Sequence, residues 1–340
     1  MSFSRRWLAP VLILGATFTT RACDLCAIYS ADSAREQKDS GFFATLSEAF
    51  IPYHTVQLNG KELEGSGMDF RDSSITHFVP SYNITRWLGV SLNVPIVYHH
   101  FQRAEIRYSL TEAAVFRTEH GSEFGLGDMS LISRFTVYEK HEMKYSFGFN
   151  VLAGVKFPTG DTDRIADEVE QTRIYDALSL PGVPHDPLGH SISGVHQHDL
   201  SPGSGSFDGI FGLTMNSRWS RWFFNAQFQY YLRTEGESGY EKGDEFMASG
   251  GPGAYLWSGK SATVNLQANA GYDTMNRDVI GGRKSEFTGM TAWYMGPQLG
   301  GTIGDNLSAV AGVDIPLQIT SNGLQNVPDY RVHASLVWRF

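Results

Sequence analysis

The chain has 340 residues and a formal charge of −9, an acidic balance that argues against nucleic acid as a partner. Beyond the first residues, no apolar stretch approaches the ~20 residues of a transmembrane helix, which excludes a helical inner-membrane protein. Glycine is abundant, with 36 residues, and so are aromatic side chains, with 22 Phe, 15 Tyr and 7 Trp. The mean hydropathy of −0.23 resembles that of a soluble protein, but strands that alternate polar and apolar residues give similar values.

The amino terminus is typical of an export signal. Arg5 and Arg6 form a short basic region before the apolar run 7–18, which is too short to span a bilayer as a helix. Small residues before Cys23 predict cleavage at that point, so residues 1–22 are expected to be a signal peptide. Acylation of Cys23, as in a lipoprotein, is the alternative.

Cys23 and Cys26 are the only cysteines of the chain. In an oxidising periplasm this CxxC pair is expected to form a local disulfide. Ala27 follows the pair, so the pattern for c-type haem attachment is not met, and no cofactor is expected there. Residues 23–40 are expected to be a short periplasmic segment, with a plug reaching into the lumen as the alternative.

The rest of the chain, residues 41–340, divides into alternating segments. A period of two places successive side chains on opposite faces of a strand. About twelve strands are predicted, an even number, as bacterial single-chain barrels have. The predicted strands are 41–53, 74–85, 87–100, 125–138, 144–157, 205–216, 221–233, 246–256, 262–274, 287–303, 307–320 and 329–340.

The lengths of the connections between these strands provide a second indication. Short and long connections alternate strictly along the chain, from a single residue at Arg86 to the long connection 158–204. A barrel with both termini in the periplasm has short turns inside and long loops outside. The sequence therefore predicts an all-β protein, a closed antiparallel transmembrane β-barrel with short periplasmic turns and long extracellular loops.

The last predicted strand, 329–340, alternates to its final residue, Phe340. It resembles the closing strand of bacterial outer-membrane barrels, in which the terminal aromatic residue is part of the signal read by the insertion machinery. The expected location is therefore the bacterial outer membrane, with lipid and the insertion machinery as partners.

Polar residues on the opposite face of the strands are expected to line the lumen. Arginine or lysine on the lipid face near the midplane costs roughly 2–4 kcal/mol, so charged side chains are expected inside. The candidates for a lumen or substrate path are Asp128, Arg134, Lys156, Asp208, Asn225, Gln227, Asn265 and Gln267.

Three glycine-rich segments resemble a known family, the outer-membrane proteins of the meta-pathway of phenol degradation. Residues 124–128 resemble its GLGD strand, residues 154–161 resemble its VKxPTGD strand end, and residues 203–208 resemble its GSGSxD segment. The resemblance implies an outer-membrane transporter for small molecules, related in style to aromatic and fatty-acid channels.

The long connection contains four histidines that are candidate metal ligands, with acidic residues beside them. They are His185, His190, His196 and His198. Imidazole with carboxylate suits zinc, copper or nickel. No other cofactor is expected.

The expected function is passive uptake of small solutes, hydrophobic or aromatic ones by the resemblance, through a porin-like channel. The alternative is a metal-binding or envelope-assembly barrel that uses the histidine-rich loop 185–199 without solute transport. The chain is not expected to be an enzyme, because Ser321-Asn322-Gly323 lacks the preceding histidine that outer-membrane phospholipases have at this motif.

Overall fold

The computed structural model describes residues 41–64, 69–179 and 185–340. The predicted signal peptide, the segment 23–40 and the Cys23–Cys26 disulfide lie outside the described residues. Within them, no helix is long and apolar enough to cross a membrane.

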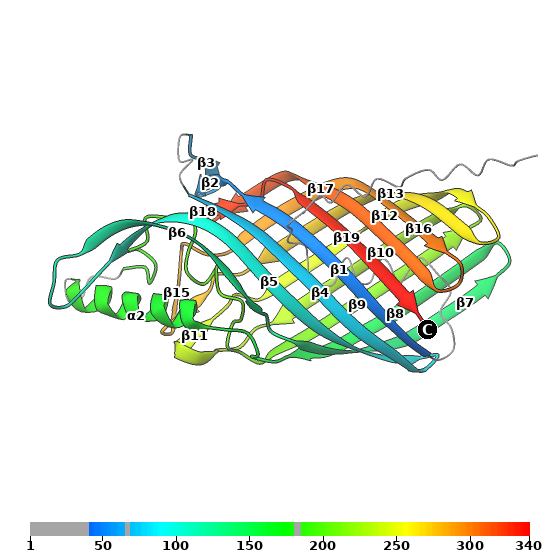
Figure 1. Cartoon of the computed structure of the whole chain (residues 1–340), viewed down its shortest axis with the longest axis horizontal. Helices are drawn as coiled ribbons and strands as arrows, with labels where there is room; N and C mark the ends of the chain where they lie inside the picture. Colours follow the sequence, from blue (N-terminus) through cyan, green and yellow to red (C-terminus); the bar gives the residue numbers. More distant parts are fainter. Residues whose placement is uncertain (1–40, 65–68, 180–184) are drawn as a thin grey trace, which may run out of the picture.

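Twelve antiparallel strands form a closed barrel, as predicted (Figure 1). Each strand pairs with its two neighbours, and pairing of the first and last barrel strands, together with that of β4 and β5, completes the ring. Closure leaves no edge in the twelve-stranded wall, so its backbone groups are paired without water. The strands are β1 (Gly41–Tyr53), β4 (Phe70–Thr85), β5 (Leu88–Arg107), β7 (Ser130–Glu142), β8 (Tyr145–Lys156), β9 (Asp208–Trp219), β10 (Trp222–Leu232), β12 (Glu245–Ser258), β13 (Ala262–Met275), β16 (Met290–Ile303), β17 (Leu307–Ser321) and β19 (Arg331–Arg339).

The predicted strand 125–138 is divided in the structure. Its beginning belongs to β6 (Val115–Leu126), which pairs with the second half of β5. The strand β7 pairs with the first half of β5. The break lies beside Pro95 of β5, whose carbonyl oxygen accepts a 2.8 Å hydrogen bond from the N–H of Gly127. Proline has no N–H to donate, so the regular ladder is interrupted at this point.

The two faces of the barrel wall differ in polarity. On β13, Leu266 is 43% exposed on the outer face, whereas its neighbour Gln267 is 5% exposed on the inner face. The last strand follows the same rule, with Leu336 and Trp338 outside and Ser335 inside. The alternation predicted from the sequence therefore places apolar side chains outside and amides and hydroxyls inside.

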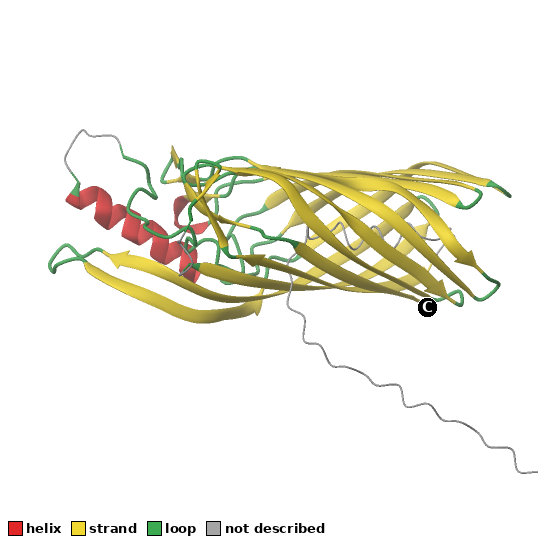
Figure 2. Ribbon diagram, turned by 90° about the horizontal axis from the view of Figure 1, so that it is seen from above, coloured by secondary structure: helices red, strands yellow, loops and turns green. Residues whose placement is uncertain are grey.

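The outer loops gather at the end of the barrel opposite the carboxyl terminus (Figures 1 and 2). The longest, residues 157–207, is called the long loop below and contains an unpredicted helix, α2 (Asp163–Leu178). Short elements from other loops join it: β2 (Thr55–Leu58), β3 (Lys61–Glu62), η1 (Glu237–Gly239), β11 (Tyr240–Glu241), β14 (Val279–Ile280), β15 (Arg283–Lys284) and β18 (Leu324–Val327). Together these loops and elements are called the outer cap.

The outer cap has a hydrophobic core of its own. Ile165 and Val169 of α2 pack with Leu188 of the long loop, Tyr240 of β11 and Ile280 of β14. A second cluster joins Val195 and Leu200 of the long loop to Phe101 on β5. The cap is therefore packed together and packed against the barrel wall.

Candidate functional site

The three glycine-rich motifs meet at the base of the long loop. The carboxylate of Asp128 accepts hydrogen bonds from Lys156 Nζ at 2.6 Å, from the N–H of Ser204 at 2.8 Å and from the N–H of Gly160 at 3.0 Å. Lys156 also lies 2.8 Å from Asp208. Three of the predicted lumen residues, Asp128, Lys156 and Asp208, therefore hold the two ends of the long loop against the barrel wall.

Two glycines allow the backbones at the two ends of the long loop to touch where they cross. A Cβ atom added to Gly203 would lie 2.6 Å from the carbonyl carbon of Gly160, closer than side chains approach in proteins. The hydroxyl of Thr159 accepts a hydrogen bond from the N–H of Met129, which ties the same crossing to the start of β7. The glycines of the motifs are thus explained by close backbone approach.

Arg233 belongs to this network, although it is not among the predicted site residues. Its guanidinium lies 2.9 Å from Asp208 and 2.8 Å from Glu245. The sequence did contain a signal for Arg233. This residue directly follows β10 and continues the set of residues that alternate onto the inner face of that strand.

Arg134 takes part in a separate polar ladder along the inner face of the barrel wall. Its Nη2 donates to Asn83 Oδ1 at 2.6 Å and its Nη1 donates to Thr136 at 3.1 Å. Thr136 in turn donates to Asn150 at 2.8 Å, and Asn150 donates to Thr214 at 2.9 Å. The ladder joins β4, β7, β8 and β9, which lie close together in the wall.

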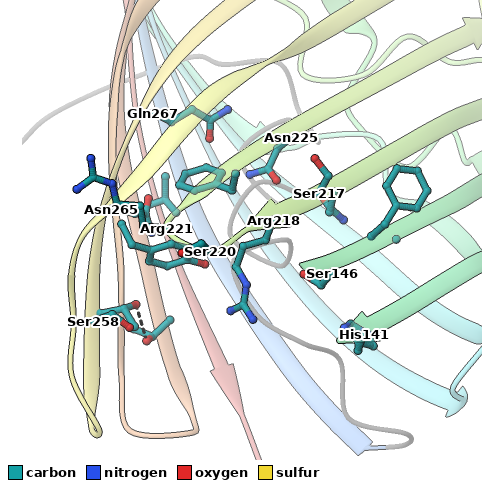
Figure 3. A pocket seen from close by; sticks show the side chains of 18 of the residues that line it. His141, Ser146, Ser217, Arg218, Ser220, Arg221, Asn225, Ser258, Asn265 and Gln267 are labelled. Atoms are coloured by element: carbon teal, nitrogen blue, oxygen red, sulfur yellow. Dashed lines mark hydrogen bonds between the residues drawn. The ribbon is translucent and has the colours of Figure 1, made fainter. Parts of the chain in front are cut away.

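A cavity of about 720 Å³ lies inside the barrel, bounded by strands and by the short turns (Figure 3). Asn225, Asn265 and Gln267 line it, as predicted residues of the lumen, whereas Gln227 does not belong to the lining. Amides, hydroxyls and arginines share the lining with aromatic rings; these are Ser146, Phe147, Asn216, Ser217, Arg218, Ser220, Arg221, Phe223, Tyr255, Trp257, Ser258, Gln298 and Thr302. Glu139 and His141 also belong to the lining and pair with each other at 2.8 Å, so the cavity combines polar and aromatic contacts with two arginines and one carboxylate.

The four loop histidines separate into two groups. His185 pairs with Asp176 at the end of α2, and His190 Nδ1 lies 3.0 Å from the carbonyl oxygen of Pro187. His196 and His198 lie together, with ring centroids 5.2 Å apart. Asp199 completes a group in which one ligand atom of each residue lies within 4.8 Å of the others.

The carboxylate of Glu168 on α2 sets the protonation of this group. It lies 2.7 Å from His198 Nδ1 and accepts the N–H groups of Gln197 at 3.0 Å and His198 at 3.1 Å. Burial alone would lower the pKa of His198, but Glu168 and Asp199 raise it to about 9. Burial and the neighbouring His198 lower the pKa of His196 to about 4. Burial alone would raise the pKa of Glu168, but His198, His196 and the Gln197 N–H lower it to about 2.

Sequence reasoning missed Glu168 and Arg71, which both contact this group. Arg71 on β4 donates to the carbonyl oxygen of Asp199 at 2.8 Å and lies 2.7 Å from its carboxylate. A signal for the helix existed, because Ile165 and Val169 are spaced by four, as on one helix face. No local pattern indicates that a residue on β4 reaches the long loop.

The fold and the polarity of its two faces define a class of protein. A closed barrel of twelve antiparallel strands, apolar outside and polar inside, is a barrel of the bacterial outer membrane. Its outward side chains contact membrane lipid.

Comparison with known proteins supports this class. No protein-family model and no curated protein match the sequence. Among solved structures, an outer membrane channel from Pseudomonas putida F1 has a TM-score of 0.57 and 11% identity, covering 90% of this chain and 97% of that one. A FadL homologue from Pseudomonas aeruginosa has a TM-score of 0.36 and 8% identity, covering 91% and 92%. The likeness to the first structure is one of fold, and membership of the meta-pathway family stays a hypothesis.

Proposed function

We propose that this barrel is a channel for passive uptake of small solutes through its lumen. The observation that carries the proposal is the cavity of about 720 Å³ inside the barrel, a volume in the range of small-molecule sites. The channel named among the similar structures supports the same function by its fold.

The cavity lining supports a class of solute. Phe223 and Tyr255 offer apolar contact to a ring, with ring centroids 5.4 Å from each other. Arg218 and Arg221 bring positive charge, which attracts a carboxylate. The proposed solutes are small aromatic compounds, with aromatic carboxylates passing faster than neutral analogues.

Liposome swelling tests the proposal. Wild-type protein is expected to pass an aromatic carboxylate faster than the amide of the same ring. The double variant Asn265→Trp/Gln267→Trp, which fills the cavity, should reduce the swelling rate for both solutes at least tenfold. Leu266→Trp is the matched control, because it adds the same ring to the same strand on the lipid face.

Two results would contradict the proposal. One is a swelling rate no higher than that of empty liposomes for every solute, with protein shown to be folded by its heat-modifiable migration. The other is equal loss of permeation in the Leu266→Trp control, which would separate permeation from the cavity.

A further inference from the structure

We propose that His196, His198 and Asp199 of the long loop form a binding site for a divalent transition-metal ion such as Zn²⁺ or Ni²⁺. The inference goes beyond the proposed function and does not depend on it. Each of the three residues offers one ligand atom, and these atoms lie within 4.8 Å of one another. Imidazole and carboxylate are the ligands that these ions prefer.

An unpaired buried nitrogen points to a ligand. His196 is 1% exposed, and its Nε2 has no hydrogen-bond partner among the described residues. Leaving a buried polar atom unsatisfied costs about 1–3 kcal/mol. A metal ion held by this nitrogen would satisfy it.

His198 is oriented as a metal-binding histidine usually is. Its Nδ1 donates to Glu168 Oε2 at 2.7 Å, which directs Nε2 away from α2, toward Asp278 at 3.7 Å. Histidine ligands typically donate their second N–H to a carboxylate in this way. Glu168 is itself held by two backbone N–H groups, so the orientation of the ring is fixed before an ion arrives.

The carboxylate ligand is also held in place. Asp199 accepts the N–H of His196 at 3.1 Å and lies 2.7 Å from Arg71 on the barrel wall. Asp278, which lies 3.7 Å from His198 Nε2, accepts the hydroxyl of Tyr240 at 2.6 Å and the N–H of Gly243 at 2.7 Å. Hydrogen bonds to ligating carboxylates are the usual second layer of a metal site.

The charge of the group suits a divalent cation. Glu168, Asp199 and Asp278 bring three negative charges, and Arg71 brings one positive charge. Binding of an ion through His198 Nε2 requires this ring to release its second proton, because the pKa of His198 is raised to about 9; two negative charges then remain. Bonds of about 2.0–2.1 Å place tetrahedral ligand atoms about 3.4 Å apart, so ligand atoms that now lie within 4.8 Å of one another must approach by up to about 1.4 Å.

Metal titration of the tag-free protein in detergent tests the site. Calorimetry with Zn²⁺ is expected to show one ion per barrel, with a dissociation constant in the micromolar range or tighter. His196→Ala and His198→Ala should each weaken binding more than 10-fold, and Glu168→Gln should weaken it about 10- to 100-fold. His185→Ala is the matched control and should leave binding unchanged, because this histidine pairs with Asp176 instead.

A second measurement does not depend on whether the variants fold. X-ray absorption of the zinc-loaded wild-type protein should count two imidazole ligands. The proposal is overturned if folded wild-type protein shows no saturable binding at millimolar Zn²⁺, or if the spectrum contains fewer than two imidazoles. Binding that survives in a folded His196→Ala/His198→Ala double variant would overturn it as well. None of these measurements involves a solute, so a failed metal site and a failed channel are distinguished.

Discussion

At the scale of single residues, Asp128, which lies between β6 and β7, shows how a residue expected in the lumen can instead hold a loop in place. Its carboxylate joins Lys156 of β8 to the backbone of Gly160 and Ser204 at the two ends of the long loop. A polar lumen residue was expected at this position, and the structure gives it the role of an anchor for the outer cap.

Asp128→Asn should loosen the long loop. The amide keeps the shape of the side chain but loses the charge-assisted bond to Lys156, at a cost of about 1–3 kcal/mol. Proteolysis of the long loop, which reports its opening, should become about 5- to 150-fold faster.

A double-mutant cycle provides the control. If the Asp128–Lys156 contact is the cause, the effects of Asp128→Asn and Lys156→Met should differ from additivity by about 0.5–3 kcal/mol. Additive effects would show that the two side chains act separately.

At the scale of elements, α2 is held by packing and not by helix propensity. Its buried apolar residues face Leu188 of the same loop and Tyr240 and Ile280 of other loops, while Ala166 faces solvent. A helix of this length is marginal in water on its own, so tertiary contacts account for its stability. The outer cap is therefore expected to open as a unit when α2 is detached.

Ile165→Asp should detach α2 from the outer cap. An unpaired charge at a position that is 2% exposed costs about 3–5 kcal/mol. Proteolysis within residues 157–207 should increase, while the barrel itself keeps its heat-modifiable migration. The adjacent Ala166→Asp, at an exposed position, should leave both readouts unchanged. Equal sensitivity of the two variants would contradict the packing described for α2.

At the scale of the whole molecule, the barrel depends on the two faces of its wall being kept apart. Leu266 and Gln267 are neighbours on β13, one outside and the other lining the cavity. The same charged side chain should therefore have opposite consequences at the two positions.

Leu266→Arg should destabilise the barrel in lipid by up to about 2–4 kcal/mol, depending on its depth in the bilayer. Gln267→Arg should be tolerated, because its side chain enters a wet cavity of about 720 Å³. Urea unfolding in liposomes, followed by tryptophan fluorescence, measures both. Similar losses of stability would place the two positions in similar surroundings and contradict the assigned register.

The outer cap and the networks within it were not predictable from the sequence. Ser204 meets Asp128 across 76 residues, and Asp199 meets Arg71 across 128 residues. The four loop histidines were candidate ligands from the sequence, but the pairing of His196 with His198 and their partner on α2 became visible only in the folded chain. Contacts of this kind depend on how the loops pack over one end of the barrel, and no short sequence pattern predicts that packing.

The sequence by itself determined the barrel. All twelve strands and the alternation of short turns with long loops follow from local properties, because strand periodicity and turn residues are read over about ten residues. The tertiary structure alone decided which lumen residues anchor the long loop, which line the cavity and which histidines lie together. The physical reason is that strand faces are set by neighbours along the chain, whereas the cap and the sites are set by side chains that folding brings together from distant segments.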